Sequence, residues 1–335
     1  TDKLRSTIKG AIDIIDADAY FVLTGCTAGI IGDDIVSVTE EFTQEGYKVY
    51  PIETPGFAGD SNLGYEIIWN TLIDKVIKKD VQKDDRLVNI FGIVPYHDPF
   101  WSGTLEEIER ILTQLGLRVN TFFTKHQGIK DIENCSAAAL NIIINPWLFK
   151  GPAKRFEDKF GVKSIRVPGL FVGATDTTAF VRQVSDALNL NRELTESVIK
   201  KEEDYVYSYL AQAIGVVSWK RYAVVADASN AAGITRYLAN DFSFTPVLVI
   251  ISEPIFRPED KERIINEISR LEYARPPKVI FATDQYEINE AIRNEKEEIT
   301  LLIGSSNERE IALEKDIQFI LGAFPVNERL IFNRT

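Results

Sequence analysis

Cys26 is the residue whose chemistry and position stand out first. It is one of only two cysteines in 335 residues, and it directly follows an apolar run, residues 20–25. That run predicts a strand, and Gly25 would allow a tight turn after it. Cys26 would then lie at the carboxyl end of the strand, where doubly wound α/β folds bind ligands and where a thiolate can be a soft metal ligand. The alternative is a small buried cysteine in a strand–helix turn.

His97 is the second candidate, in a loop that follows the apolar run 86–94. The loop, residues 94–101, also carries aromatic side chains, prolines and the carboxylate of Asp98. Such a loop could form a pocket wall in which histidine contacts a substrate or cofactor and donates a proton. The alternative is a rigid loop whose histidine is only hydrogen-bonded. We expect the other histidine, His126, in a surface loop.

Composition limits the metal chemistry and the size of the fold. Two cysteines, Cys26 and Cys135, and two histidines exclude a disulfide framework and a tetrahedral zinc site of the usual spacing, so a metal centre must take further ligands from elsewhere. A chain of 335 residues exceeds the size at which one core usually stays single, which predicts two or three domains. The net charge of −12 argues against a nucleic-acid partner, which needs a basic surface.

The sequence shows no sign of a membrane or secretory location. It has no run of 18 apolar residues, and residues 1–5 do not lead into the apolar core of a signal peptide. No Walker A or dinucleotide-binding glycine pattern supports nucleotide binding. We therefore expect a cytoplasmic protein that binds neither membranes nor nucleic acid.

Short apolar runs alternate with segments of helical period along the whole chain. Near-continuous Val, Ile and Leu runs predict strands buried on both faces, as in parallel sheets. The alternation predicts an α/β fold of two to three Rossmann-like domains, with parallel sheets covered by helices. Strands are expected at residues 20–25, 49–53, 86–94, 119–124, 140–145, 164–167, 222–226, 246–252, 278–282, 300–304 and 318–322.

One segment, residues 191–217, has no strand signal and predicts a long helix. We therefore divide the chain into a partial Rossmann-like cluster-binding domain at 1–85, a Rossmann-like domain at 86–190, a linking helix at 191–219 and a C-terminal Rossmann-like domain at 220–335. Before that helix, Thr175 or Asp176 is expected to cap a helix at residues 175–188.

Four segments resemble, in chain order, sequence blocks of the nitrogenase component 1 superfamily, which includes the subunits of the molybdenum–iron protein. Together they extend over nearly the whole chain. They are Cys26-Thr27 followed by Ile30-Ile31-Gly32-Asp33-Asp34; Thr54-Pro55-Gly56-Phe57-Ala58-Gly59 with Gly64-Tyr65; residues 105–115 ahead of Gly116-Leu117; and Phe324-Pro325-Val326-Asn327-Glu328-Arg329.

The resemblance implies a role for Cys26. Each subunit of the family supplies three cysteines to an iron–sulfur cluster at a subunit interface, and two of them precede the block that contains Cys26. Cys26, flanked by Gly25 and Thr27, would be the third ligand and would bind the metal of a cluster shared with a partner. That partner would be a homologous α-type subunit or a second copy of the chain, and an ATP-dependent iron protein would supply electrons.

The chain departs from the family's α-type subunit, which also holds a cofactor through one cysteine and one histidine. That cysteine should follow the strand at 140–145, where this chain has Asn145-Pro146-Trp147, and no histidine follows His126. Cys135 precedes the strand and is not assigned this role. The chain therefore resembles a β-type subunit or a nitrogenase-like paralogue without that cofactor site. Its catalytic residues stay unknown, with His97 as a candidate.

Three functions follow from this reading, and the substrate cannot be read from the sequence. The first is a subunit of a nitrogenase-like, iron–sulfur-dependent oxidoreductase that accepts electrons from the iron protein. The second is a non-catalytic scaffold for cofactor assembly, so whether the chain is part of an enzyme stays open. The third is a metal-free α/β protein that binds a small molecule, in which Cys26 would be buried and unreactive.

Overall fold

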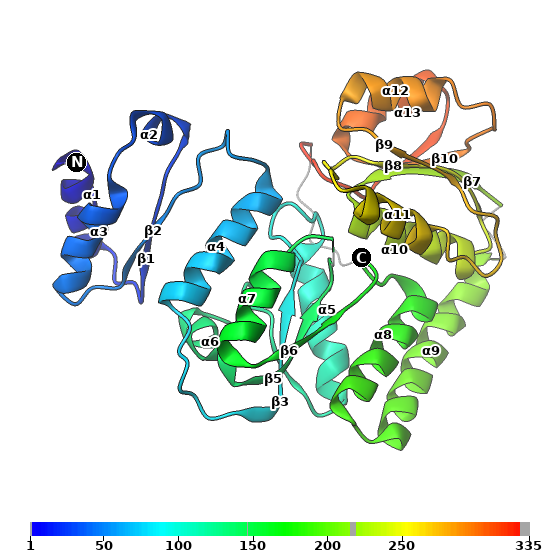
Figure 1. Ribbon diagram of the computed structural model, residues 1–335. Coiled ribbons are helices and arrows are strands. Elements are labelled where there is room, and N and C mark those ends of the chain that lie inside the picture. Colours follow the sequence, from blue (N-terminus) through cyan, green and yellow to red (C-terminus); the bar gives the residue numbers. More distant parts are fainter. Residues whose placement is uncertain (1, 146, 215–218, 329–335) are drawn as a thin grey trace. The chain divides into compact units, whose positions relative to one another are not determined.

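The computed structural model describes residues 2–145, 147–214 and 219–328 and forms two compact units (Figure 1). Both contain parallel strands connected by helices, so the expected α/β class, with parallel sheets covered by helices, is confirmed. The domain boundaries expected from the sequence stay a prediction. The first unit consists of Thr1–Asp85, Phe122–Ala138 and Phe149–Lys163, and the second of Arg86–Thr121, Ala139–Leu148 and Ser164–Thr335.

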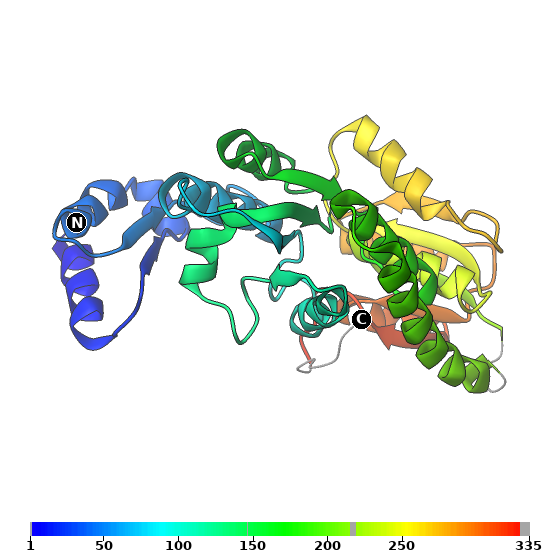
Figure 2. The same ribbon diagram turned by 90° about the horizontal axis from the view of Figure 1, so that it is seen from below.

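The first unit contains a two-stranded parallel sheet of β1 (Tyr20–Leu23) and β2 (Val49–Ile52). Helices α1 (Asp2–Ile14) and α3 (Ile35–Gln44) cover one of its faces (Figure 2). Alternate side chains of β1 point to the other face, where Leu23 remains 55% exposed. This face is open at Leu23 only in part, because Ile52, which pairs with Leu23 and points to the same face, is buried. The buried core beneath the two helices consists of Ile8, Val38, Phe42 and Val49.

An aromatic cluster holds the remaining segments of the first unit together. Trp69 is fully buried, and its ring centroid lies 4.8 Å from that of Phe122 and 6.1 Å from that of Phe149. Edge-on aromatic contacts of this kind add to the free energy gained from burial. Glu133 is buried as well and accepts hydrogen bonds from Lys48 and, at 2.8 Å, from Lys78. The helices of this part are α4 (Ser61–Lys75), α6 (Ile129–Asn134) and α7 (Lys150–Phe160).

The second unit begins with a four-stranded sheet in the order β4 (Arg118–Asn120), β3 (Asp84–Phe91), β5 (Ala138–Ile143) and β6 (Lys163–Arg166). Helix α5 (Trp101–Gln114) connects β3 to β4 and buries an apolar stripe at helical spacing. Across the sheet, Asn120 donates to Asn89 at 2.8 Å and Asn89 donates to Asn141 at 2.9 Å. All three asparagines are buried, so side-chain hydrogen bonds fix this part of the sheet in addition to the backbone ladder.

A five-stranded parallel sheet forms the C-terminal part of the second unit, in the order β11, β10, β7, β8, β9. Alternate strand residues face opposite cores, as in a doubly wound sheet. Helices α10 and α11 cover one face, and α12 and α13 cover the other (Figure 1). The bounds are β7 (Arg221–Ala226), α10 (Ala228–Asn240), β8 (Thr245–Ile251), α11 (Pro258–Ile268), β9 (Lys278–Phe281), α12 (Gln285–Arg293), β10 (Leu301–Gly304), α13 (Arg309–Glu314) and β11 (Gln318–Leu321).

Two long helices precede this sheet. Helix α8 (Gly173–Leu188) begins two residues before the expected start, and its N-cap residue, Val172, provides no side-chain cap. The expected caps were wrong: the Thr175 hydroxyl donates to Asp241, and the Asp176 carboxylate accepts from Arg236 at 2.6 Å. Helix α9 (Arg192–Ile214) matches the long helix expected at 191–217, whose last three residues lie outside the described part of the chain. None of the described helices combines the length and apolar character that a membrane span needs.

Candidate functional site

Cys26 lies directly beyond the carboxyl end of β1, at the position the sequence predicts. It is the first residue of a short helix, α2 (Cys26–Ile31), rather than part of an open loop. Gly25 has φ −87° and ψ 177°, an extended conformation that any residue can adopt, so the expected glycine-dependent turn is not at residue 25. The left-handed residue is Gly32, with φ 72°, which ends α2. The side chain of Cys26 is exposed.

The first two sequence blocks meet at this point. The Thr54 amide donates to the Thr24 hydroxyl at 3.0 Å, which joins the segments that follow β1 and β2. A Cβ atom built on Gly56 would lie 3.1 Å from the Cys26 sulfur, and one built on Gly29 would lie 2.8 Å from Cβ of Pro55. Glycines at these positions allow the 54–59 segment to lie directly against α2 and the thiol.

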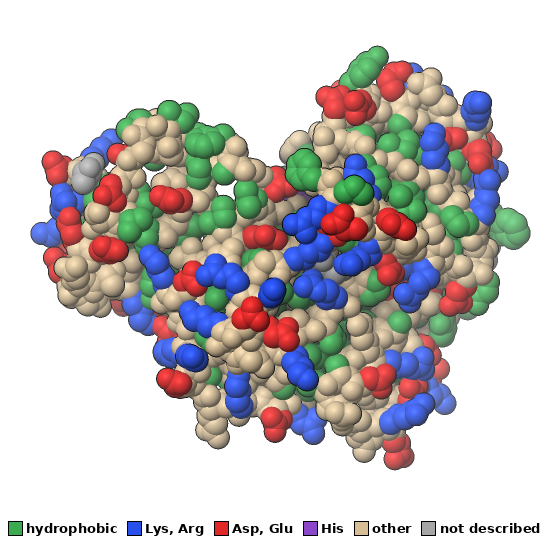
Figure 3. Space-filling view, viewed as in Figure 1, with side chains coloured by type: hydrophobic (Ala, Val, Ile, Leu, Met, Phe, Trp, Pro, Cys, Tyr) green, Lys and Arg blue, Asp and Glu red, His purple; other side chains and the backbone are tan. Residues whose placement is uncertain are grey.

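Exposed apolar side chains surround Cys26. Helix α2 has no buried residue although its sequence is almost wholly apolar. Figure 3 shows hydrophobic side chains gathered over this helix. An exposed apolar patch of this kind is typical of a surface that another protein covers. We call it the Cys26 surface; it consists of Leu23 (55% exposed), Ile30 (76%), Ile31 (69%) and Phe57 (62%).

The described residues supply one cysteine side chain to this site and no complete metal site. Within the residues that the structure describes, no three or more His, Cys, Asp or Glu side chains come together in a way that could hold a metal ion. The second cysteine, Cys135, is fully buried, and burial raises the pKa of its thiol far above the usual range. A thiol held in the protonated form is a poor metal ligand. Of the two cysteines, Cys26 is therefore the one that an external group can reach, and its metal binding stays a prediction.

His97 lies in the second unit, where the loop after β3 meets the fourth sequence block. Its ring lies against that of Phe324, with centroids 4.5 Å apart and planes inclined by 33°. Its Nδ1 atom is buried and has no hydrogen-bond partner among the described residues. His126, by contrast, is exposed, as expected from the sequence. The structure thus brings His97 and Phe324 together, and whether His97 contacts a ligand stays a prediction.

Asp98, beside His97, is the carboxylate that the sequence analysis noted in this loop without giving it a role of its own. Its side chain is buried, and this burial raises the pKa of its carboxyl group to about 7. The Phe100 amide donates to it at 2.8 Å and opposes that shift, whereas the negative charge of Asp227 adds to it. Asp227 itself caps α10 by accepting from the Ser229 amide at 3.0 Å. Asp98 can therefore change its protonation state near neutral pH.

The position at which an α-type subunit would carry its cofactor cysteine follows β5. Asn145 is buried there, and its side-chain oxygen accepts from the Leu148 amide at 3.3 Å. Gly92, with φ 94°, lies close to Asn145: a Cβ atom added to Gly92 would come within 2.6 Å of the backbone nitrogen of Asn145. Trp147 is buried, and Pro146 lies outside the described residues. A tightly packed turn thus occupies this position.

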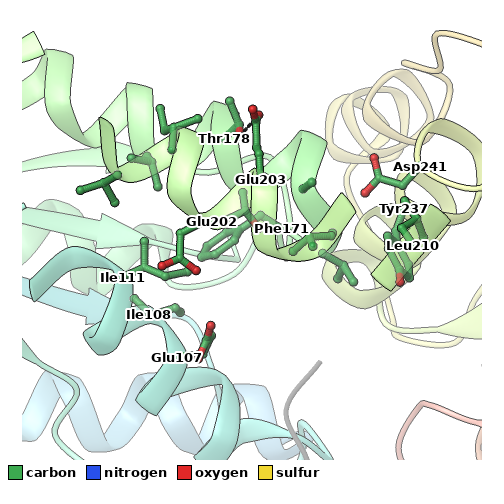
Figure 4. Close-up of a pocket in the computed structure, with 18 of the residues that line it drawn as sticks. Glu107, Ile108, Ile111, Phe171, Thr178, Glu202, Glu203, Leu210, Tyr237 and Asp241 are labelled. Atoms are coloured by element: carbon green, nitrogen blue, oxygen red, sulfur yellow. Dashed lines mark hydrogen bonds between the residues drawn. The ribbon is translucent and has the colours of Figure 1, made fainter. Parts of the chain in front are cut away.

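A separate cavity of about 300 Å³ lies among α5, α8, α9 and α10 of the second unit (Figure 4). Most of its wall is apolar, and carboxylates from α5, from α9 and from Asp241 at the end of α10 reach it. His97 is not among the residues that line it. The cavity is therefore distinct from both candidate sites that the sequence indicates.

Comparison with known proteins identifies the family. A family model described as Nitrogenase component 1 type Oxidoreductase matches residues 1–334. The "Nitrogenase iron-molybdenum cofactor biosynthesis protein NifE" of Sinorhizobium fredii is 26% identical over 274 residues, which are 78% of this chain and 53% of that protein. The "Nitrogenase vanadium-iron protein beta chain" of Trichormus variabilis is 23% identical over 334 residues, which are 92% of this chain and 70% of that one.

The fold agrees with this match. The solved structure described as "Nitrogenase Cp1 at pH 6.5" superposes with a TM-score of 0.78 and 18% identity, covering 99% of this chain and 74% of that one. The chain spans about half the length of the first relatives, 53% of the Sinorhizobium fredii protein and 42% of the NifE protein of Clostridium pasteurianum. Because the family model nevertheless matches almost every residue of this chain, the chain belongs to the family of nitrogenase component 1 type oxidoreductases.

Proposed function

We propose that this chain is one subunit of a nitrogenase-like complex and that the Cys26 thiolate helps to hold an iron–sulfur cluster at the interface with a homologous partner. The observation that supports this most is the exposed thiol in the middle of the apolar Cys26 surface. Iron–sulfur clusters need thiolate ligands, and the surrounding protein tunes their reduction potential by limiting access of water. A partner that covered Leu23, Ile30 and Phe57 would provide such surroundings.

The chemistry of this surface fits one ligand position. Cys26 is exposed, and Gly56 beside its sulfur has no side chain to block an approaching metal. The remaining ligands would come from the partner or from residues other than the described ones. A bound cluster would accept and pass on single electrons. Cys26 would fix its position, and the apolar side chains around Cys26 would exclude water when the partner is bound.

We infer that the complex takes its electrons from an ATP-dependent iron protein and passes them to a substrate, as an oxidoreductase of this family would. A second candidate is a scaffold for cofactor assembly, which the similarity to proteins named for iron–molybdenum cofactor biosynthesis supports. The two are distinguished by adding the reduced iron protein with MgATP. An oxidoreductase would turn over a substrate, whereas a scaffold would instead deliver a cofactor to an acceptor protein that lacks it.

The cluster itself is tested by iron and sulfide analysis. The full gene product, prepared without oxygen together with its homologous partner, should be brown and contain both elements. Cys26→Ala should lower the iron content and change the visible absorption while the circular dichroism stays that of the α/β fold. Cys135→Ala is the matched control, because that thiol is buried away from the site, and it should keep its iron. Equal iron in both variants would refute the proposal.

A further inference from the structure

The cavity among α5, α8, α9 and α10 is not part of the Cys26 site, and none of its lining residues belongs to the Cys26 surface. Its body is apolar and is built from both buried and half-buried side chains of three helices, α5, α8 and α9. At about 300 Å³ it is near the lower end of the sizes of small-molecule sites, large enough for a compact ligand. The apolar wall includes Ile108, Ile111, Val181, Ile199, Val206 and Leu210.

Among the described residues, the charged side chains that line this cavity are all acidic. The described residues that line it include four carboxylates and no lysine, arginine or histidine. Two of the four share one cation, because Arg110 bridges Glu107 at 2.7 Å and Glu202 at 2.6 Å. Hydrogen bonds from Arg110, and a weaker one from Gln114, hold the pKa of Glu202 at about 2. The ion pair between Arg110 and Glu202 is therefore structural, since it connects α5 to α9.

The other two carboxylates, Glu203 and Asp241, have no ion-pair partner among the described residues. Glu203 accepts one hydrogen bond, from the Thr178 hydroxyl at 2.7 Å. Asp241 accepts from the Thr175 hydroxyl, and its second oxygen, Oδ2, is buried without a hydrogen-bond partner among the described residues. Burial raises the pKa of Asp241, whereas hydrogen bonds from the Thr175 hydroxyl and from the Thr175 and Ala174 amides oppose that shift.

Figure 4 shows how these groups are arranged around the space. Asp241 lies with Tyr237 and Leu210 toward one end of the view, whereas Glu202 lies with Ile111 and Phe171 toward the other. Glu203 stands between them beside Thr178, to which a dashed line connects it. An apolar space thus runs beside two carboxylates that lack an ion-pair partner among the described residues, with Arg182 as the cation that interacts electrostatically with Glu203.

We propose that this cavity binds a small organic cation, a primary ammonium compound with a compact aliphatic body. The ammonium group would donate hydrogen bonds to Glu203 and Asp241, and the aliphatic body would pack against Val206, Leu210 and Ile199. Charge-assisted hydrogen bonds are the stronger kind, and a cation next to a partly buried carboxylate removes the cost of burying that charge unpaired. An anion of the same shape would be repelled, and a neutral analogue would gain only the apolar contact. This inference is independent of the role of Cys26.

Isothermal titration calorimetry with three six-carbon probes tests the proposal on the complete protein. Hexylammonium should bind saturably to one site, hexan-1-ol at least about tenfold more weakly and hexanoate not at all. Glu203→Gln and Asp241→Asn keep an acceptor oxygen for Thr178 and Thr175, and each should weaken hexylammonium binding about tenfold or more. Glu193→Gln is the matched control, because it removes one charge from the exposed first turn of α9 without touching the cavity.

A fourth variant separates the cavity from simple surface charge. Val206→Phe should fill the apolar space and abolish binding while both carboxylates remain. Circular dichroism and the midpoint of thermal unfolding should show that each variant is folded before it is titrated. Absence of saturable hexylammonium binding to the unaltered protein would overturn the proposal. Equal affinity for hexan-1-ol, or unchanged affinity in both the Asp241→Asn and Val206→Phe variants, would overturn it too.

Discussion

The sulfur of Cys26 lies against the backbone of Gly56, so closely that a Cβ atom on residue 56 would come within 3.1 Å of it. This contact joins two segments that are 30 residues apart in the sequence. A hydrogen bond of 3.0 Å from the Thr54 amide to the Thr24 hydroxyl joins the same two segments. The direction of the thiol therefore depends on the segment after β2 as well as on its own helix. A change at residue 56 can redirect the thiol without removing it.

A larger side chain at position 56 should impair metal binding while the thiol is retained. Gly56→Val places a branched Cβ 3.1 Å from the sulfur, closer than ordinary contact, so the thiol must shift from its present position. We expect less iron per chain in protein prepared without oxygen, with circular dichroism unchanged. Gly64→Ala is the matched control, since a Cβ at that helical glycine would meet no atom within 4 Å. Full iron content in Gly56→Val would mean that the position of the sulfur does not matter.

Asp98 should make the stability of the protein depend on pH. Its pKa rises from the ordinary 3.8 to about 7 in the folded protein because of burial, so the native state binds more protons than the unfolded chain between these values. The free energy of unfolding should therefore fall as pH rises from about 4 through 7. The contribution of Asp98 is fully present below pH 3.8 and is lost above about 7.

Asp98→Asn should remove this dependence. Asparagine keeps an oxygen for the Phe100 amide and cannot ionise, so urea unfolding at about pH 8 should show a gain of about 2–4 kcal/mol over the unaltered protein. Near pH 4 the two proteins should be equally stable. Asp158→Asn, which changes an exposed aspartate on α7, serves as the control and should leave the curve unaltered. A pH-independent difference between Asp98→Asn and the unaltered protein would contradict the assignment.

The buried asparagines of the four-stranded sheet should contribute strongly to stability. Asn89→Leu removes an acceptor from Asn120 and a donor from Asn141 at once, in a place that water does not reach. We expect a loss of about 2–4 kcal/mol in the free energy of unfolding, measured by urea denaturation. Asn266→Ala, on the exposed side of α11, should change it by less than about 0.5 kcal/mol. A loss below 1 kcal/mol for Asn89→Leu would show that the asparagine chain is dispensable.

The sequence predicts the regular elements because their signals are local. The apolar run before Cys26 becomes β1, and the helical period of residues 191–217 becomes α9 over the part of that segment that the structure describes. The resemblance of four short blocks to a known family also survives comparison of the whole chain. Period and chain order are enough for such predictions, since neither depends on distant contacts.

Features that depend on distant residues could not be predicted in the same way. Thr175 and Asp176 look like helix caps, but they bind Asp241 and Arg236, more than 50 residues away, which only the folded chain brings near. The apolar run that becomes β3 gives no hint that Asn89 is hydrogen-bonded across the sheet. The Cys26 surface is likewise invisible in the sequence, because an apolar short helix is usually buried. The cavity among α5, α8, α9 and α10 could not be predicted either, because it forms only where these helices pack together.

The most direct test of the central claim is to look for iron bonded to residue 26. Selenocysteine in place of Cys26, in the complex prepared without oxygen, gives a single selenium atom whose X-ray absorption reports its neighbours. If Cys26 is a cluster ligand, the selenium spectrum should show iron at bonding distance, and the protein should keep its brown colour. A spectrum with only the carbon of the side chain as neighbour, in protein that still contains iron and sulfide, would contradict the account.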